Sequence, residues 1–142
     1  MRKIRKMKFV LNFSAIFILS VLCIKATAQS SFNLDNTTSG IKLYHQIVQC
    51  NGSDVVFLKF ENTTTQNVTI TFIQVFDTQI EKGVASFKGS KKLLLLPGII
   101  MQEGCDDKVH PDFVLTASDV TPAYLAKILA FSFSNITVVT AQ

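Results

Sequence analysis

The chain has 142 residues, of which 48% are hydrophobic, and its 14 basic and 10 acidic side chains give a net charge of +4. Six of the basic residues lie within the first 28 positions, so the rest of the chain has eight Lys against ten Asp or Glu, a net charge of −2. This balance argues against nucleic-acid binding, and the remaining length fits one domain rather than two.

The first 28 residues have the three regions of a secretory signal peptide. Residues 1–8 carry five Lys or Arg, residues 9–24 are mostly apolar, and Ala26-Thr27-Ala28 provides the small residues for cleavage. The apolar run is shorter than the roughly 20 residues that a membrane-spanning helix needs, which disfavours an uncleaved anchor. A lipoprotein would be modified at Cys23, but a bulky leucine precedes this cysteine. We therefore predict cleavage of residues 1–28, a secreted or periplasmic location and no membrane span after cleavage.

Cys50 and Cys105 remain after cleavage, because Cys23 leaves with the signal peptide. In an oxidising compartment such a pair forms a disulfide, and closing a loop of this length stabilises a protein by about 4 kcal/mol. Two free thiols or a metal-binding pair are the alternatives, but neither cysteine has further ligands at metal-binding spacing. The sequence therefore predicts a Cys50–Cys105 disulfide.

Residues 29–40 are mostly polar and predict a flexible lead-in to a β-domain over residues 41–142. A strand is expected over residues 41–50, where His45 shares one side with apolar residues. Asn51-Gly52-Ser53-Asp54 is typical of a turn, because Asn and Gly accept positive φ and Asp and Ser bond to nearby backbone. This turn is expected to join the first two strands.

Two further strands are predicted on either side of a polar loop. The first covers residues 55–61, and its inward side chains are expected to be Val56, Leu58 and Phe60. The second covers residues 68–76, with an inward set of Val68, Ile70, Phe72, Gln74 and Phe76. Near Ile73 and Val75 this strand becomes apolar on both sides, which indicates cover by a loop, a second sheet or a partner. Ile73 and Val75 are therefore predicted to mark a partner-binding edge.

Shorter elements are predicted beyond this point. Residues 84–88 favour a short strand and residues 89–92 a turn. The four leucines at 93–96 predict a buried strand, because Pro97-Gly98 stops the run too soon for a helix. A strand is expected to continue at residues 99–101.

The last part of the chain begins with an irregular acidic loop over residues 103–111. A strand is predicted at 113–117, followed by a helical turn from Thr121-Pro122, which resembles an N-cap with Pro at the first position. Two strands over residues 128–134 and 135–140 close the chain. The whole pattern is typical of an all-β antiparallel sandwich of about seven or eight strands.

Several segments resemble small exported bacterial immunoglobulin-like β-sandwich proteins of unknown function. They are a strand ending in Cys50, residues 57–62, residues 67–70, Leu96-Pro97-Gly98 before Cys105, and residues 135–138. The resemblance implies an immunoglobulin-like antiparallel β-sandwich, and it brings no catalytic or binding residue with it. The chain contains no Trp, so the Cys, Trp and Cys pattern of true immunoglobulin domains is missing.

Five asparagines stand in Asn-x-Ser/Thr sequences, namely Asn36, Asn51, Asn62, Asn67 and Asn135. On an exported protein these are potential glycan acceptors. The alternative is that Asn favours turns and Thr favours the exposed side of strands, which produces the same triplets. We favour this alternative, because the basic leader indicates a bacterial protein.

The densest group of potential metal ligands consists of Glu103, Asp106, Asp107 and Asp112, with His110 among them. Calcium binds where several oxygens converge from a tight loop. A solvated acidic loop is the alternative and is favoured, because the spacing matches no known metal site. No cofactor is predicted.

His45 and His110 are the two imidazoles and thus the candidates for a general base near neutral pH. His45, Ser53 and Asp54 offer a base, a hydroxyl and a carboxylate, but they follow one another along one strand and turn. Ser53 also lacks the strand-to-helix context of a nucleophile elbow. We predict no catalytic residue. A carbohydrate platform is also disfavoured, because it relies on Trp and Tyr faces and the abundant Phe residues suit a core.

These observations predict an exported, non-enzymatic interaction or structural module with a protein or cell-surface partner. The alternative is a small exported hydrolase or metal-dependent enzyme built on His45 and the loop at 103–112.

Overall fold

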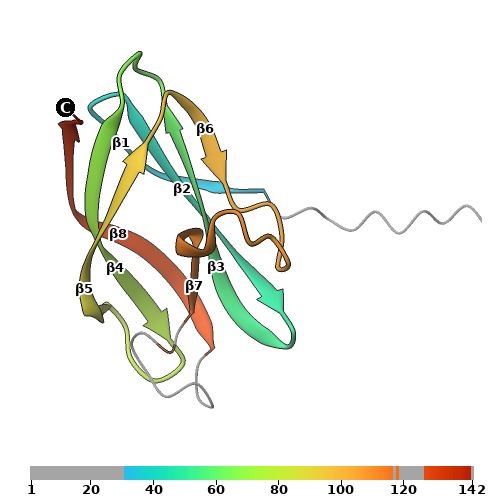
Figure 1. Ribbon diagram of the computed structural model, residues 1–142. Helices are drawn as coiled ribbons and strands as arrows, with labels where there is room; N and C mark the ends of the chain where they lie inside the picture. The colour runs from blue at the N-terminus through green and yellow to red at the C-terminus, as the bar shows by residue number, and fades with distance from the viewer. Residues whose placement is uncertain (1–30, 117, 119–126, 142) are drawn as a thin grey trace, which may run out of the picture.

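The computed structural model describes residues 31–116, 118 and 127–141, and this part of the chain consists of β-strands joined by turns and loops, with short 3₁₀ turns (Figure 1). The strands are β1 (Asn33–Thr38), β2 (Ile41–Cys50), β3 (Ser53–Asn62), β4 (Val68–Thr78), β5 (Val84–Leu95), β6 (Gly98–Met101), β7 (Val114–Thr116) and β8 (Ile128–Thr140). A 3₁₀ turn, η1 (Pro111–Phe113), precedes β7. The signal peptide predicted over 1–28 and the helical turn predicted at 121–122 lie outside the described residues.

The strands form two antiparallel sheets. The five-stranded sheet has the order β1-β2-β3-β6, with β7 pairing with β3 as well. The three-stranded sheet has the order β5-β4-β8. Side chains from both sheets enter one hydrophobic core, which is the arrangement of a β-sandwich. The predicted all-β antiparallel class is confirmed.

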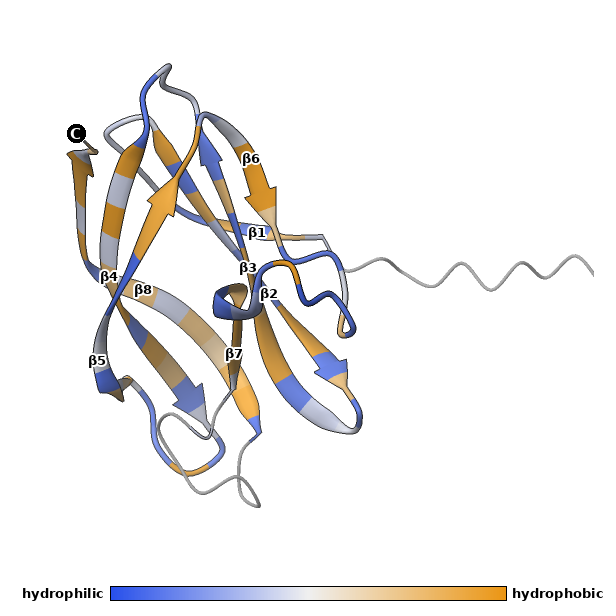
Figure 2. Cartoon of the chain, viewed as in Figure 1, coloured by the Kyte–Doolittle hydropathy of each residue, from blue (hydrophilic) through white to orange (hydrophobic). Residues whose placement is uncertain are grey.

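Alternation along the strands decides which side chains enter the core. The buried apolar residues of β2, β3 and β4 include Ile41, Leu43, Val56, Leu58, Phe60, Val68, Ile70, Phe72 and Phe76. The inward residues predicted for β3 and β4 are thus confirmed, and Figure 2 shows the alternation along β4. Phe60, Phe72 and Phe133 pack with ring centroids between 5.0 and 6.0 Å apart. Each fully buried Phe contributes about 1.5–3 kcal/mol to stability.

The N-terminal segment differs from the expected flexible lead-in, because Asn33–Thr38 form β1 and pair with β2. Its polar composition conceals the strand, since β1 is nearly all exposed and is held by backbone hydrogen bonds rather than burial. The register shifts between Leu34 and Asn36, so Asp35 is a bulged residue. A β-bulge redirects a side chain, and this one brings Asp35 to His45.

β5 also differs from the prediction of a short strand, a turn and a buried strand. It is one strand with an irregularity, because Ile73 pairs with Ser90 while Val75 pairs with Ala85. Gly89 has a φ of 75° within this irregularity, a conformation that glycine adopts without strain. The leucine run alternates instead of being wholly buried, since β5 is an edge strand with one face open. Leu94 and Leu96 are 59% and 52% exposed.

β8 joins the two strands that were predicted at 128–134 and 135–140. The break was expected at Asn135, whose φ of 50° is left-handed. The register with β4 shifts at this point, so the residue is accommodated as a bulge and the strand continues.

The predicted Cys50–Cys105 disulfide is confirmed, with 5.6 Å between the two Cα atoms. Cys50 has the outward parity of β2, so the bond fixes the loop around Cys105 on the outer side of the five-stranded sheet. Val55 and Phe57 are buried as well, although they lie on the outward parity of β3. The outer face of this sheet is therefore partly covered.

Candidate functional site

The acidic residues predicted as weak metal ligands do not converge on one point in the structure but have different surroundings. Asp107 accepts hydrogen bonds from the backbone N–H of Glu103 at 3.4 Å and of Val109 at 2.8 Å, which closes the loop on itself. Asp112 instead pairs with Lys91, at 3.2 Å between Oδ1 and Nζ. Asp106 is exposed. Across residues 31–116, 118 and 127–141, no three His, Cys, Asp or Glu side chains are grouped to hold a metal ion.

His45 pairs with a carboxylate that the sequence did not single out. Its Nδ1 lies 2.6 Å from Oδ2 of Asp35, and the residue is 8% exposed against the ring of Phe131. The pairing of His45 with Asp35 was not predicted, because Asp35 lies in the segment that was expected to be flexible. The pair holds β1 against β2.

Ser53 and Asp54 do not join His45. Ser53 pairs with Cys50, which lies five positions after His45 on the same strand. This corresponds to a distance of about 16 Å. Asp54 accepts hydrogen bonds from Gln49 Nε2 at 2.9 Å and from the backbone N–H of Ile128 at 3.0 Å. His110 stacks on Phe113, with 5.1 Å between ring centroids. The structure therefore does not assemble the hydroxyl, imidazole and carboxylate set considered from the sequence.

The Asn-x-Ser/Thr sites differ in whether the fold leaves the asparagine free to carry a glycan. Asn62 is 3% exposed, and its Nδ2 donates to the carbonyl oxygens of Gln66 at 2.8 Å and Leu95 at 3.3 Å. A glycan on this nitrogen is incompatible with these bonds. Asn51 adopts positive φ in the turn between β2 and β3, as the turn interpretation predicts, whereas Asn135 adopts positive φ at the bulge within β8.

An ordered charge network lies on the outer face of the five-stranded sheet. Lys42 Nζ lies 3.1 Å from both carboxylate oxygens of Glu61, and the Tyr44 hydroxyl donates to Glu61 at 3.0 Å. The hydrogen bond from Lys42, followed by that from Tyr44, lowers the pKa of Glu61, and the same bond to Glu61 raises the pKa of Lys42. Partial burial and then the bond to Glu61 raise the pKa of Tyr44. Lys59 Nζ lies 4.7 Å from the centroid of the Tyr44 ring.

Ile73 and Val75, predicted to mark a partner-binding edge, lie on β4, the middle strand of the three-stranded sheet. The edge part of that prediction needs correction, because β5 and β8 take up the backbone hydrogen bonds on both sides of β4. Both side chains point outward and are half-buried among small neighbours. They belong to the face of a sheet rather than to its edge.

The outer face of the three-stranded sheet is nearly free of charge. The cross-strand register assigns it Thr69, Thr71, Ile73, Val75 and Asp77 from β4, Ala85, Ser90, Lys92 and Leu94 from β5, and Ala130, Ser132, Ser134, Thr137 and Val139 from β8. The charged members of this set are Lys92 and Asp77. Apart from Leu94, the rest are small or β-branched side chains. The β4 members are half-buried, and most of those on β5 and β8 are exposed.

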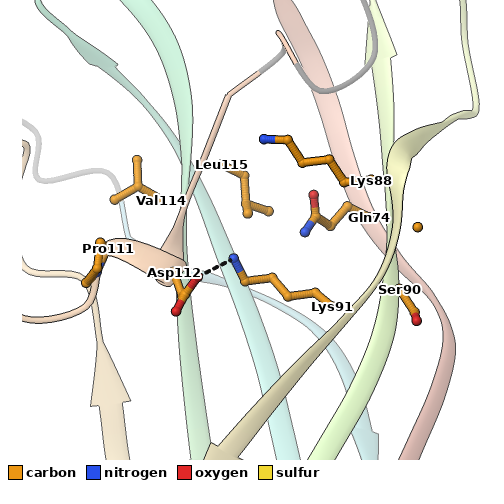
Figure 3. A pocket seen from close by; sticks show the side chains of 9 residues that line it. Gln74, Lys88, Ser90, Lys91, Pro111, Asp112, Val114 and Leu115 are labelled. Atoms are coloured by element: carbon orange, nitrogen blue, oxygen red, sulfur yellow. Dashed lines mark hydrogen bonds and ion pairs between the residues drawn. The ribbon is translucent and has the colours of Figure 1, made fainter.

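A cavity of about 310 Å³ opens between the two sheets, where β5 faces η1 and β7. Figure 3 shows Gln74 and Leu115 in the pocket, with Lys88 and Lys91 reaching across it from β5. Gln74 is 4% exposed, and its Oε1 has no hydrogen-bond partner in the described structure. The sequence placed Gln74 on the inward side of its strand, and a polar residue at such a position was the available signal for this pocket.

The chain matches no protein-family model, no curated protein and no solved structure. Within the residues that the structure describes, no helix is both long and apolar enough to cross a bilayer. Because a fold alone does not define a function, the function has to be inferred from the outer sheet face and the pocket.

Proposed function

We propose that the chain is an exported, non-enzymatic, immunoglobulin-like β-sandwich that works as an interaction module. Its contact surface is the outer face of the three-stranded sheet, and its partner is another protein with a flat, uncharged surface. The observation that carries this proposal is the near absence of charge across the three neighbouring strands of that face.

The two outer faces of the sandwich differ in a way that supports this choice. The outer face of the five-stranded sheet is partly covered by the Cys105 loop and carries the ions of Lys42, Lys59 and Glu61. The opposite face has Ile73 and Val75 at its centre, with Leu94 and Val139 on either side of Thr69. Protein interfaces are depleted of charge at their centre, and such a face packs well against another sheet.

Export is supported by the sequence of residues 1–28 and by the disulfide, because disulfides persist in oxidising compartments. Cleavage is tested by the mass of the protein isolated from its own culture. A mass that begins at Gln29 agrees with the proposal, whereas retention of the leader contradicts it.

The alternative enzyme draws less support from the geometry. It requires His45 and the loop at 103–112 to act together. His45 points into the sandwich and pairs with Asp35, whereas the disulfide holds the loop outside the five-stranded sheet. Substitution of His45, His110, Asp106 and Asp107 leaves the biological effect unchanged if the protein acts by binding. Loss of that effect in a folded variant favours the enzyme instead.

Affinity capture from the native culture tests the contact surface. The bait is the protein as secreted, in the native sequence and as the double variant Ile73→Thr and Val75→Thr. Val48→Thr is the matched control, because Val48 is a half-buried valine on the outward parity of the other sheet. We expect the double variant to retain at most about a tenth of the captured partner, which corresponds to about 1.4 kcal/mol. Equal capture by a folded double variant, or loss in the control, contradicts the proposed surface.

A further inference from the structure

The pocket beside Gln74 lies at an open side of the sandwich. β5 is an edge strand of one sheet, β7 has a single partner strand in the other, and the cavity of about 310 Å³ lies between them. Its walls come from both sheets, with Leu115 on one side and Lys91 on the other (Figure 3). Small-molecule sites occupy clefts of roughly 300–1,000 Å³, so this cavity is large enough for a small ligand.

The irregularity in β5 creates this space. Ile73 pairs with Ser90 and Val75 pairs with Ala85, so Gln74, which lies between them, has no paired residue on β5. The residues between Ala85 and Ser90 are displaced from the ladder at this point. β-bulges are over-represented beside functional sites, where they redirect side chains and interrupt pairing.

Gln74 is an unusual choice at this position. It occupies the inward row of β4 between the fully buried Phe72 and Phe76, where an apolar residue would satisfy the core. Its Oε1 is a buried acceptor without a partner in the described structure, and such a group costs about 1–3 kcal/mol. Figure 3 shows its amide directed into the pocket. A hydrogen-bond donor on a ligand removes this cost.

Lys91 is the group in this lining that can bind an anion. Its ammonium group has three N–H donors. Lys91, whose side chain is 19% exposed, bonds to Asp112, whose side chain is 75% exposed. A ligand carboxylate accepts from a donor of Lys91 that Asp112 does not use, while Leu115 and Val114 provide an apolar wall.

We propose that this pocket binds a small carboxylate that also carries an O–H or N–H donor, with the donor on Gln74 Oε1 and the carboxylate at Lys91. Uronic acids and N-acylated amino acids share this chemistry. The site is independent of the outer sheet face, because Gln74 and Lys91 have the inward parity of their strands.

The test is a titration of the ¹⁵N-labelled secreted protein, followed by amide chemical shifts. The probes are glucuronate and N-acetylalanine, which have both groups, methyl glucoside, which lacks the carboxylate, and butyrate, which lacks the donor. We expect one or both of the first two probes to bind at least tenfold more tightly than the last two. Binding is followed by the shifts of the amides around Gln74, Ser90 and Leu115. Binding by one of the first two alone identifies the source of the ligand. Binding by none of the probes leaves a pocket that holds water only and overturns the proposal.

Variants separate the two contacts. Gln74→Leu is expected to weaken the binding of glucuronate and N-acetylalanine at least tenfold and to leave the affinity for butyrate unchanged. Lys91→Met is expected to weaken the binding of every carboxylate probe at least tenfold. Lys92→Met is its control, because Lys92 is the adjacent lysine and points to the opposite side of the strand. If Gln74→Leu does not fold, the lysine pair decides the outcome. Equal affinities of Lys91→Met and Lys92→Met contradict the proposed site.

Discussion

Replacement of Gln74 by leucine should make the protein more stable, although it removes a polar side chain from a site that we assign to binding. Gln74 Oε1 is buried without a partner, and its neighbours along the inner row are Phe72 and Phe76. Replacing an unpaired buried acceptor by an apolar group of similar size removes a penalty of about 1–3 kcal/mol. For a domain of this size, each kcal/mol corresponds to a rise in Tm of about 4–8 °C.

Asn62→Leu is the matched control for this measurement. Asn62 is buried like Gln74, but its amide bonds to Gln66 and Leu95, and its Oδ1 accepts from the backbone N–H of Thr64 at 3.0 Å. The same type of substitution should therefore lower the free energy of unfolding by about 1–3 kcal/mol, because it leaves those backbone groups unpaired. Urea titrations of both variants provide the comparison. A loss of stability in Gln74→Leu as large as that in Asn62→Leu would mean that the Gln74 amide is paired in the folded protein.

Two further predictions concern the periphery of the sandwich. Replacing Cys50 and Cys105 by serine should lower the free energy of unfolding in urea titrations by about 4 kcal/mol, since the bond closes a long loop; an unchanged midpoint would contradict this. The Glu61 pKa is lowered from its usual value of 4.5 by its bond from Lys42, so the stability that this bond adds is present above pH 4.5 and is lost as the pH falls through the lowered pKa. In the Glu61→Gln variant, the free energy of unfolding should fall less between pH 4.5 and the lowered pKa than in the native protein. An equal fall in both proteins would exclude Glu61 as the cause.

The strands that bury one face were predictable from sequence, because alternation is a local property. Val56, Leu58 and Phe60 face the core as the pattern indicates, and so do Phe72 and Phe76. The disulfide was also predictable, because the predicted cleavage would leave two cysteines, and export would place them in an oxidising compartment.

β1, by contrast, has Leu34 as its one apolar residue, and this side chain is exposed. The pairing of β1 with β2 is a long-range property of the backbone. The irregularity of β5 was predicted to be a turn, because here too the structure depends on pairing with a distant strand. Gly89 is compatible with both a turn and a bulge, and only the partner strand decides between them.

The candidate surfaces were partly accessible from sequence. The loss of alternation at Ile73 and Val75 indicated an unusual outer face, but the order of strands that makes β4 central is not encoded in one segment. The pocket was hidden in the same way. Gln74 was placed inward correctly, but the missing partner on β5 that opens space beside it depends on the register between two strands.

The most direct test of the proposed interaction surface is photo-cross-linking in the native culture. A photoreactive phenylalanine derivative is placed at Thr137, an exposed position on the outer face of the three-stranded sheet, or at Asp106, an exposed position in the disulfide-anchored loop. If the outer face of the three-stranded sheet is the contact surface, position 137 gives a protein adduct and position 106 gives none. An adduct from position 106 alone, or equal adducts from both positions, would contradict the assignment of this face as the binding surface.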